Sequence, residues 1–145
     1  MKELKLILIT LTYFLIFSSF QNNHDVHSVE ILRYWIGKTE FQSIELKKGI
    51  ISKWMRNKSP LVMQMNDLQK YELNGVLAKF DLEEFKQKAV HIQEAPQDVY
   101  PKIYYRFIVN GDTIQTKDFV LKEMPEEVKL LDKLLIKYTT PGFRY

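Results

Sequence analysis

The chain has 145 residues, of which 46% are hydrophobic, 27% charged and 13% aromatic, and its formal net charge is +3. This composition is typical of a single globular domain and excludes collagen-like, low-complexity and disordered chains. Because the sequence contains no cysteine, it also excludes disulfide frameworks, thiolate-based metal sites and cysteine nucleophiles.

The N-terminus has the pattern of a secretory signal peptide over residues 1–20. Lysines near the start precede an apolar run over residues 6–17, and small residues follow it. This order is typical of an export signal, and the run is shorter than the roughly 20 residues that a bilayer span needs. We therefore expect an exported protein, periplasmic or extracellular. Ile16 and Phe17 stand where a cleavage site favours small residues, so an uncleaved N-terminal membrane anchor stays open.

Residues 21–28 are polar and are expected to form a flexible lead. They contain His24, Asp25 and His27, and two histidines three positions apart can share a metal ion. A structural zinc site needs four ligands, however, and no second pair occurs at a recognisable spacing, so we expect no metal and no cofactor. Loss of residues 1–20 lowers the formal charge by one unit, and a nearly neutral chain argues against nucleic acid as the partner.

The folded domain is placed at residues 29–140, and its first half begins with predicted strands. Three segments have strand composition or alternation: residues 29–36, 41–47 and 50–55. A turn at residues 47–49 joins the last two, and residues 56–60 form a predicted loop. Trp35 and Trp54 are assigned to the core.

A first helix is predicted after Asn66, which forms a variant capping box with Gln69. An apolar stripe at helical spacing follows: Leu73, Val76, Leu77 and Phe80. Gly75 costs roughly 1 kcal/mol inside a helix relative to alanine, and we interpret it as a place of close packing against a strand.

A second helix is predicted over residues 82–91. Asp81 can cap the Glu84 N–H while the Glu84 side chain reaches back to Asp81, and Phe80 and Phe85 occupy the positions of a hydrophobic staple. Prolines then bound an extended linker over residues 94–101.

The clearest sequence element is a hairpin over residues 103–120, with Asn110-Gly111 as a preferred type I′ turn pair. Before the turn, alternation places one set of residues on a common face: Ile103, Tyr105, Phe107 and Val109. After the turn, parity adds three more residues to that face: Ile114, Thr116 and Val120.

A last helix opens with Pro125 at its first position and continues through Tyr138. Its apolar face consists of Val128, Leu131, Leu134, Leu135 and Tyr138. The helix ends before a tail at residues 141–145. Hairpins separated by helices predict an α+β fold, with an antiparallel sheet of about five strands and two to three helices on one face.

Catalytic motifs are scarce in this sequence. His91 is the only histidine of the predicted domain, so a small hydrolase would have to be centred on it. The chain has no Gly-x-Ser-x-Gly elbow and no glycine-rich phosphate loop. Glu83 and Glu84 are adjacent helical residues that point in different directions, which argues against a paired-carboxylate site. We predict no catalytic residue, and the His91 hydrolase stays an alternative.

The face of the hairpin opposite the core set combines aromatic and basic residues. Tyr104, Arg106 and Ile108 project from it, near Tyr100 and Lys102. Such a face can bind a peptide or a polysaccharide by stacking, cation–π contact and hydrogen bonding. Ordinary cross-strand pairing on a partly covered sheet is the alternative.

Three segments carry a resemblance to known proteins: residues 66–85, 103–119 and 125–135. Their order resembles that of small exported bacterial α+β proteins, most of them uncharacterised, and it is more faintly similar to emfourin-type protease inhibitors. The missing catalytic groups and the aromatic–basic face of the hairpin indicate a non-enzymatic exported binding module, and the resemblance adds that it could be inhibitor-like. Its expected partner is a secreted or envelope protein or a polysaccharide. An envelope-tethered structural accessory protein is the alternative, and only its uncleaved N-terminus would contact a membrane.

Overall fold

The computed structural model describes residues 28–140. The predicted signal peptide, the histidines of the lead and the tail at residues 141–145 lie outside the described residues. Within the described part, no helix is long and apolar enough to cross a membrane.

The fold is α+β, as predicted, with an antiparallel sheet of seven strands and three α-helices. The strands are β1 (Val29–Ile36), β2 (Phe41–Lys47), β3 (Ile50–Met55), β4 (Leu61–Gln64), β5 (Lys102–Val109), β6 (Asp112–Gln115) and β7 (Phe119–Val120). The helices are α2 (Asp67–Leu77), α3 (Leu82–His91) and α4 (Glu126–Tyr138), with a 3₁₀ turn η1 (Leu121–Glu123) before α4. The sheet order is β4-β3-β2-β1-β5-β6, and β7 pairs with β5 beyond the end of β6.

The predicted number of about five strands is too low for two reasons. The short strand β4 was not predicted, because it has only four residues and follows a loop directly. The return strand of the late hairpin is broken into β6 and β7, which were predicted as one.

The break between β6 and β7 also corrects one residue of the predicted hairpin face. Phe107 lies opposite Ile114, but Ile103 lies opposite Phe119, so one extra residue has entered the return strand between these pairs. A shift of one residue exchanges the two faces of a strand. Phe119 is therefore the buried residue, and Val120 lies on the other face.

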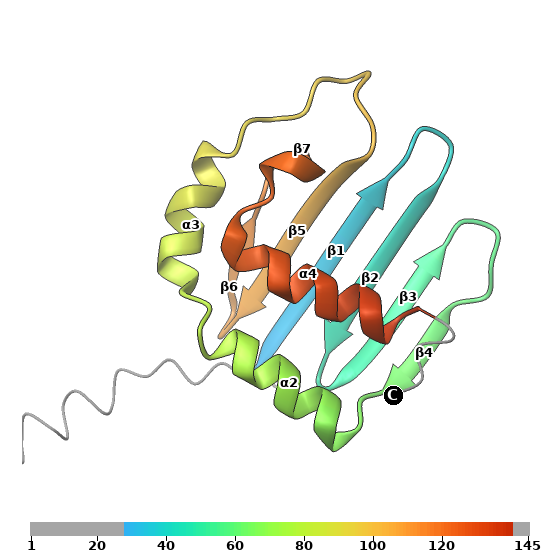
Figure 1. The fold of residues 1–145 in the computed structure, drawn as a ribbon, viewed down its shortest axis with the longest axis vertical. Coiled ribbons are helices and arrows are strands. Elements are labelled where there is room, and N and C mark those ends of the chain that lie inside the picture. Colours follow the sequence, from blue (N-terminus) through green and yellow to red (C-terminus); the bar gives the residue numbers. More distant parts are fainter. Residues whose placement is uncertain (1–27, 141–145) are drawn as a thin grey trace, which may run out of the picture.

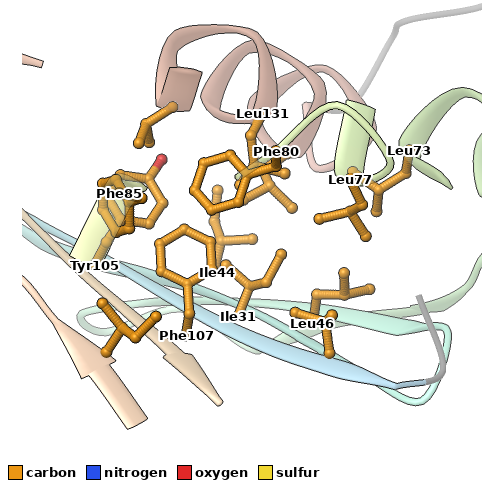
Figure 2. Packing of buried hydrophobic residues seen from close by; sticks show 14 of the residues in the cluster. Ile31, Ile44, Leu46, Leu73, Leu77, Phe80, Phe85, Tyr105, Phe107 and Leu131 are labelled. Carbon is orange, nitrogen blue, oxygen red and sulfur yellow. The ribbon is translucent and has the colours of Figure 1, made fainter. Parts of the chain in front are cut away.

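All three helices contribute to one core with the same face of the sheet. Figure 1 shows α4 lying across the sheet, with α3 near β6 and α2 near the end of the sheet where β1 begins. In Figure 2, side chains from the strands face Leu77, Phe80 and Leu131 of the helical layer. The Phe107 ring contacts both Phe80 and Phe85, with ring centroids 5.2 Å apart in each pair. This packing confirms helices on one face and leaves the opposite face to the site described below.

The predicted caps define where α2 and α3 begin. Asn66 and Gln69 form the reciprocal capping box, with both hydrogen bonds at 2.9 Å. The Asp81 carboxylate accepts the Glu84 N–H at 2.9 Å, whereas the Glu84 carboxylate pairs with Lys88 Nζ at 2.7 Å. The Phe80 and Phe85 rings, with centroids 5.2 Å apart, make the contact expected of the staple.

Two interpretations of single residues are wrong. Gly75 is exposed, and a Cβ atom added there would meet nothing within 4 Å, so close packing does not explain this glycine. Trp54 is 50% exposed and not a core residue. The reason is the two-residue turn at Lys48 and Gly49, both with positive φ, which places Trp54 opposite Ser43 on the face away from the helices.

Candidate functional site

The face of the sheet opposite the helices is the candidate site. Along each strand its side chains alternate with the buried core residues, so they point away from the helical layer. We call this surface the open face, and its central members are Leu32, Tyr34, Phe41, Ser43, Trp54, Tyr104, Arg106 and Ile108. Nothing in residues 28–140 forms a second layer over it, since the three helices pack on the other side.

An aromatic row crosses the open face. Tyr34 lies opposite Tyr104 on one side and Ser43 on the other, and Ser43 lies opposite Trp54. The Tyr34 ring centroid is 5.4 Å from that of Tyr104 and 5.4 Å from that of Phe41. Four neighbouring strands about 4.8 Å apart give the row a length of about 14 Å. Trp54 and Phe41 are 50% and 39% exposed, so large ring surfaces face solvent.

Ser43 shows how closely the aromatic side chains pack. It is buried although no helix covers it, because it lies between Trp54 and Tyr34 in the row. The row is therefore a continuous apolar surface and not a set of separate rings.

Polar side chains border the row on its β5 and β1 side. Arg106 donates from Nη2 to the Tyr104 hydroxyl at 3.2 Å and from Nε to Gln115 Oε1 at 3.3 Å. These bonds hold the guanidinium 6.0 Å from the centroid of the Tyr104 ring. Glu30 pairs with Lys47 at 2.9 Å, and the hydrogen bond from the Lys47 ammonium to Glu30 raises the pKa of that lysine.

The five residues predicted from the sequence fall into two groups. Tyr104, Arg106 and Ile108 lie together on the open face. Lys102 is buried, donates from Nζ to the Gln97 carbonyl at 3.2 Å, and lies 5.4 Å from the centroid of the Tyr100 ring. Lys102 and Tyr100 thus form their own contact at the start of β5, and Lys102 offers no exposed charge.

Sequence reasoning missed the other half of the row, namely Tyr34, Phe41 and Trp54. The signal was present in the turn at Lys48-Gly49, because a two-residue hairpin fixes which residues of β2 and β3 lie opposite each other. In that register Trp54 of β3 lies opposite Ser43 of β2, on the outward face of the hairpin and not in the core.

The hollow beside His91, the centre of the alternative hydrolase, is lined without a hydroxyl side chain. His91 is exposed at the end of α3, beside a surface hollow whose lining includes Glu84, Lys88 and Glu123 but no serine or threonine. A serine hydrolase needs a hydroxyl within hydrogen-bond reach of the histidine. Among residues 28–140 there is also no group of three or more histidine, aspartate or glutamate side chains that could hold a metal ion.

A buried polar cluster lies on the opposite, helical side of the sheet. Arg33 Nε donates to Asp132 Oδ1 at 2.5 Å, and the Tyr105 hydroxyl donates to the same oxygen. Burial raises the pKa of the Tyr105 phenol well above its usual value, and the Asp132 charge adds to that shift. The side chains of Arg33 and Asp132 are only 5% and 8% exposed, so the cluster joins α4 to the sheet and does not reach a ligand.

Comparison of the chain with protein-family models, with curated proteins and with solved structures gives no match.

Proposed function

We propose that this chain is an exported, non-enzymatic binding module that recognises another protein through the open face. One observation carries the proposal, namely the aromatic row of Trp54, Phe41, Tyr34 and Tyr104 on a sheet face that the helices leave uncovered. Contiguous exposed apolar surface of this kind marks interaction sites in folded proteins.

The composition of the open face favours a protein partner. Protein interfaces have an apolar centre rich in tryptophan, tyrosine and arginine, with charged residues at the rim. The open face has Trp54 and Tyr34 near its centre, Arg106 at its border and the Glu30–Lys47 pair at its edge. A polysaccharide would also stack on these rings, and it is the other outcome of the experiment below.

The export part of the proposal is supported by residues 1–20, whose basic start and apolar run are typical of a secretory signal. The partner is then a secreted or envelope protein. If that partner is a secreted protease, this chain would act as its inhibitor. N-terminal sequencing of the exported product tests this part. A start between residues 19 and 22 supports a free exported module, whereas an intact N-terminus supports the envelope-tethered accessory.

The binding experiment compares Trp54→Ala with Tyr71→Ala in the tagged full chain. Both substitutions remove a large exposed ring, but Tyr71 lies on α2, away from the open face, and is 79% exposed. Proteins captured from the native envelope and culture medium are identified by mass spectrometry, and the affinity of each captured protein is then measured by calorimetry. A central aromatic contact contributes about 2 kcal/mol or more, so Trp54→Ala should weaken binding about 30-fold.

The matched control decides the result. Retained binding by Tyr71→Ala together with loss by Trp54→Ala supports the proposal. Equal binding by both variants contradicts the proposal. If the chain instead binds a polysaccharide and this binding depends on Trp54, the ligand is a carbohydrate and not a protein. Arg106→Ala adds a second test on the same face, because it removes the guanidinium that contacts Tyr104.

A further inference from the structure

Within residues 28–140, the backbone hydrogen-bonding groups on the outer edge of β4 face no other strand. β4 is the last strand on its side of the sheet, and no other strand within residues 28–140 pairs with its outer edge. The Met65 N–H donates to the Gly49 carbonyl at 3.0 Å, so Met65 points its backbone groups toward β3. Because these groups alternate in an antiparallel ladder, Met63 and Leu61 also face β3, whereas Val62 and Gln64 face outward.

Apart from its short length of four residues, this edge strand carries none of the features that normally prevent edge pairing. Its four residues, Leu61 to Gln64, carry no charge and contain no proline, and Val62 is 62% exposed. Natural sheets protect edges with charges, prolines, bulges or covering elements. The opposite edge of this sheet is protected in that way, since β6 begins with Asp112 and the chain bulges after Gln115.

We propose that the β4 edge pairs with the β4 edge of a second copy of this chain about a two-fold axis. The axis passes through Met63, and Val62 of each copy lies opposite Gln64 of the other. Both residues have outward backbone groups, so this register forms four hydrogen bonds. The inference is independent of the proposed function, because it uses the backbone edge of β4 and not the aromatic row.

The charges at the two ends of β4 are self-complementary in this arrangement. Lys58 precedes the strand, and Asp67, whose side chain is fully exposed, follows it. The two-fold axis reverses the strand, so Lys58 of one copy meets the end of β4 that carries Asp67 in the other. Within one copy the Lys58 charge acts on Lys53, because it contributes, after burial and Arg33, to the lowered pKa of that lysine. A carboxylate from a second copy relieves this repulsion.

The geometry also fixes how the two copies are oriented. Opposite residues in a ladder point their side chains to the same face, and Met63 packs on the helical side. The helices of both copies therefore lie on one side of the joined sheet, and the two open faces form one continuous surface. Leu68, exposed on the first turn of α2, adds apolar area at the same end of β4.

The first experiment measures the mass of the full chain by light scattering over a range of protein concentrations. We expect a concentration-dependent dimer. Val62→Pro should weaken association about tenfold or more, because symmetry removes two hydrogen bonds at once. The N–H that proline removes points away from β3, so the hydrogen bonds between β3 and β4 are kept. Val62→Thr, which keeps the N–H and the branched shape, is the matched control and should dimerise.

Charge exchange distinguishes a second copy from a strand of another protein. Lys58→Glu and Asp67→Lys should each weaken the dimer about three- to tenfold, and the double variant should restore it. A cysteine at Met63 tests the register, because the chain has no other cysteine. Residues on the axis form a non-hydrogen-bonded pair with Cα atoms about 4.5 Å apart, which suits a disulfide. Leu61→Cys is the control, since the two copies of Leu61 would lie about 13 Å apart.

A monomer at every concentration overturns the proposal. So does a dimer that Val62→Pro leaves unchanged, or charge variants that the double substitution does not rescue. If Val62→Pro fails to fold by circular dichroism, the charge exchange and the Met63→Cys cross-link decide the question. None of these variants changes the aromatic row of Trp54, Phe41, Tyr34 and Tyr104, so failure here leaves the proposed function standing.

Discussion

Removing the carboxylate of Asp132 should cost about 3–5 kcal/mol of unfolding free energy. The change is Asp132→Ala, in the cluster that joins α4 to β1 and β5. Asp132 Oδ1 accepts hydrogen bonds from Arg33 and from Tyr105, and both partners are buried. Without Asp132 the guanidinium stays in the interior with no counter-charge, and the phenol loses its acceptor.

The magnitude follows from burial. An exposed ion pair contributes about 0–1 kcal/mol, but the Arg33 side chain is only 5% exposed and has little access to water. The uncompensated charge of Arg33 causes the larger loss of unfolding free energy. The Tyr105 hydroxyl, left without its acceptor, contributes about 1–3 kcal/mol. The total unfolding free energy of a domain of this size is about 5–15 kcal/mol, so the variant should lose a large part of its stability.

The assay is urea unfolding followed by tryptophan fluorescence and circular dichroism. It compares Asp132→Ala, Asp132→Leu, Arg33→Met and the variant with Asp132→Leu and Arg33→Met together. The double variant leaves no charge in this cluster, so it should recover most of the loss. A loss below about 1 kcal/mol for Asp132→Ala would refute the reasoning. So would a double variant as unstable as the sum of the single losses, because contacting residues should couple.

Three further predictions concern local features. Gly75→Ala should stabilise the protein by about 0.5–1 kcal/mol, because the residue is helical and exposed and an added Cβ would meet no other atom. Gly111→Ala should destabilise the protein, because Gly111 has a φ of 88°. Thermal unfolding measures both changes. Asn66→Ala should cost about 1 kcal/mol through loss of the α2 cap, whereas Asn66→Asp should retain most of the stability in the same assay. Tyr105 has a raised pKa in the folded state, so its phenol stays protonated above about pH 10 while the unfolded chain releases the proton. The unfolding free energy should therefore fall as the pH rises above about 10, and urea titrations should show a smaller fall for Tyr105→Phe; equal slopes for the two proteins would contradict this.

The local elements could be predicted because their signals are contained in a few neighbouring residues. The capping box at Asn66, the staple of Phe80 and Phe85 and the turn at Asn110-Gly111 each depend on positions close in the sequence. The helix α3 accordingly begins and ends where it was predicted. Strand β4 was missed because a short strand is defined by its neighbour β3, not by a pattern of its own.

Only the part of the candidate site that depends on local sequence patterns could be predicted. Tyr104 and Arg106 follow from alternation within the late hairpin, which is a local property. Tyr34 and Trp54 join them only through the order β3-β2-β1-β5, which brings residues 34, 54 and 104 into one row. The pairing of β1 with β5 spans about half of the chain, and no local signal specifies it.

The sequence by itself determined the class of the fold, the caps and the turns, and the lack of cysteine chemistry. Only the tertiary structure decided which face of the sheet the helices cover, and therefore which aromatic rings are core and which are exposed. It also decided that Arg33, Tyr105 and Asp132, three residues far apart in the chain, share one buried site. The physical reason is that hydrogen-bonded turns and caps form between neighbours, whereas burial depends on which distant segments pack together.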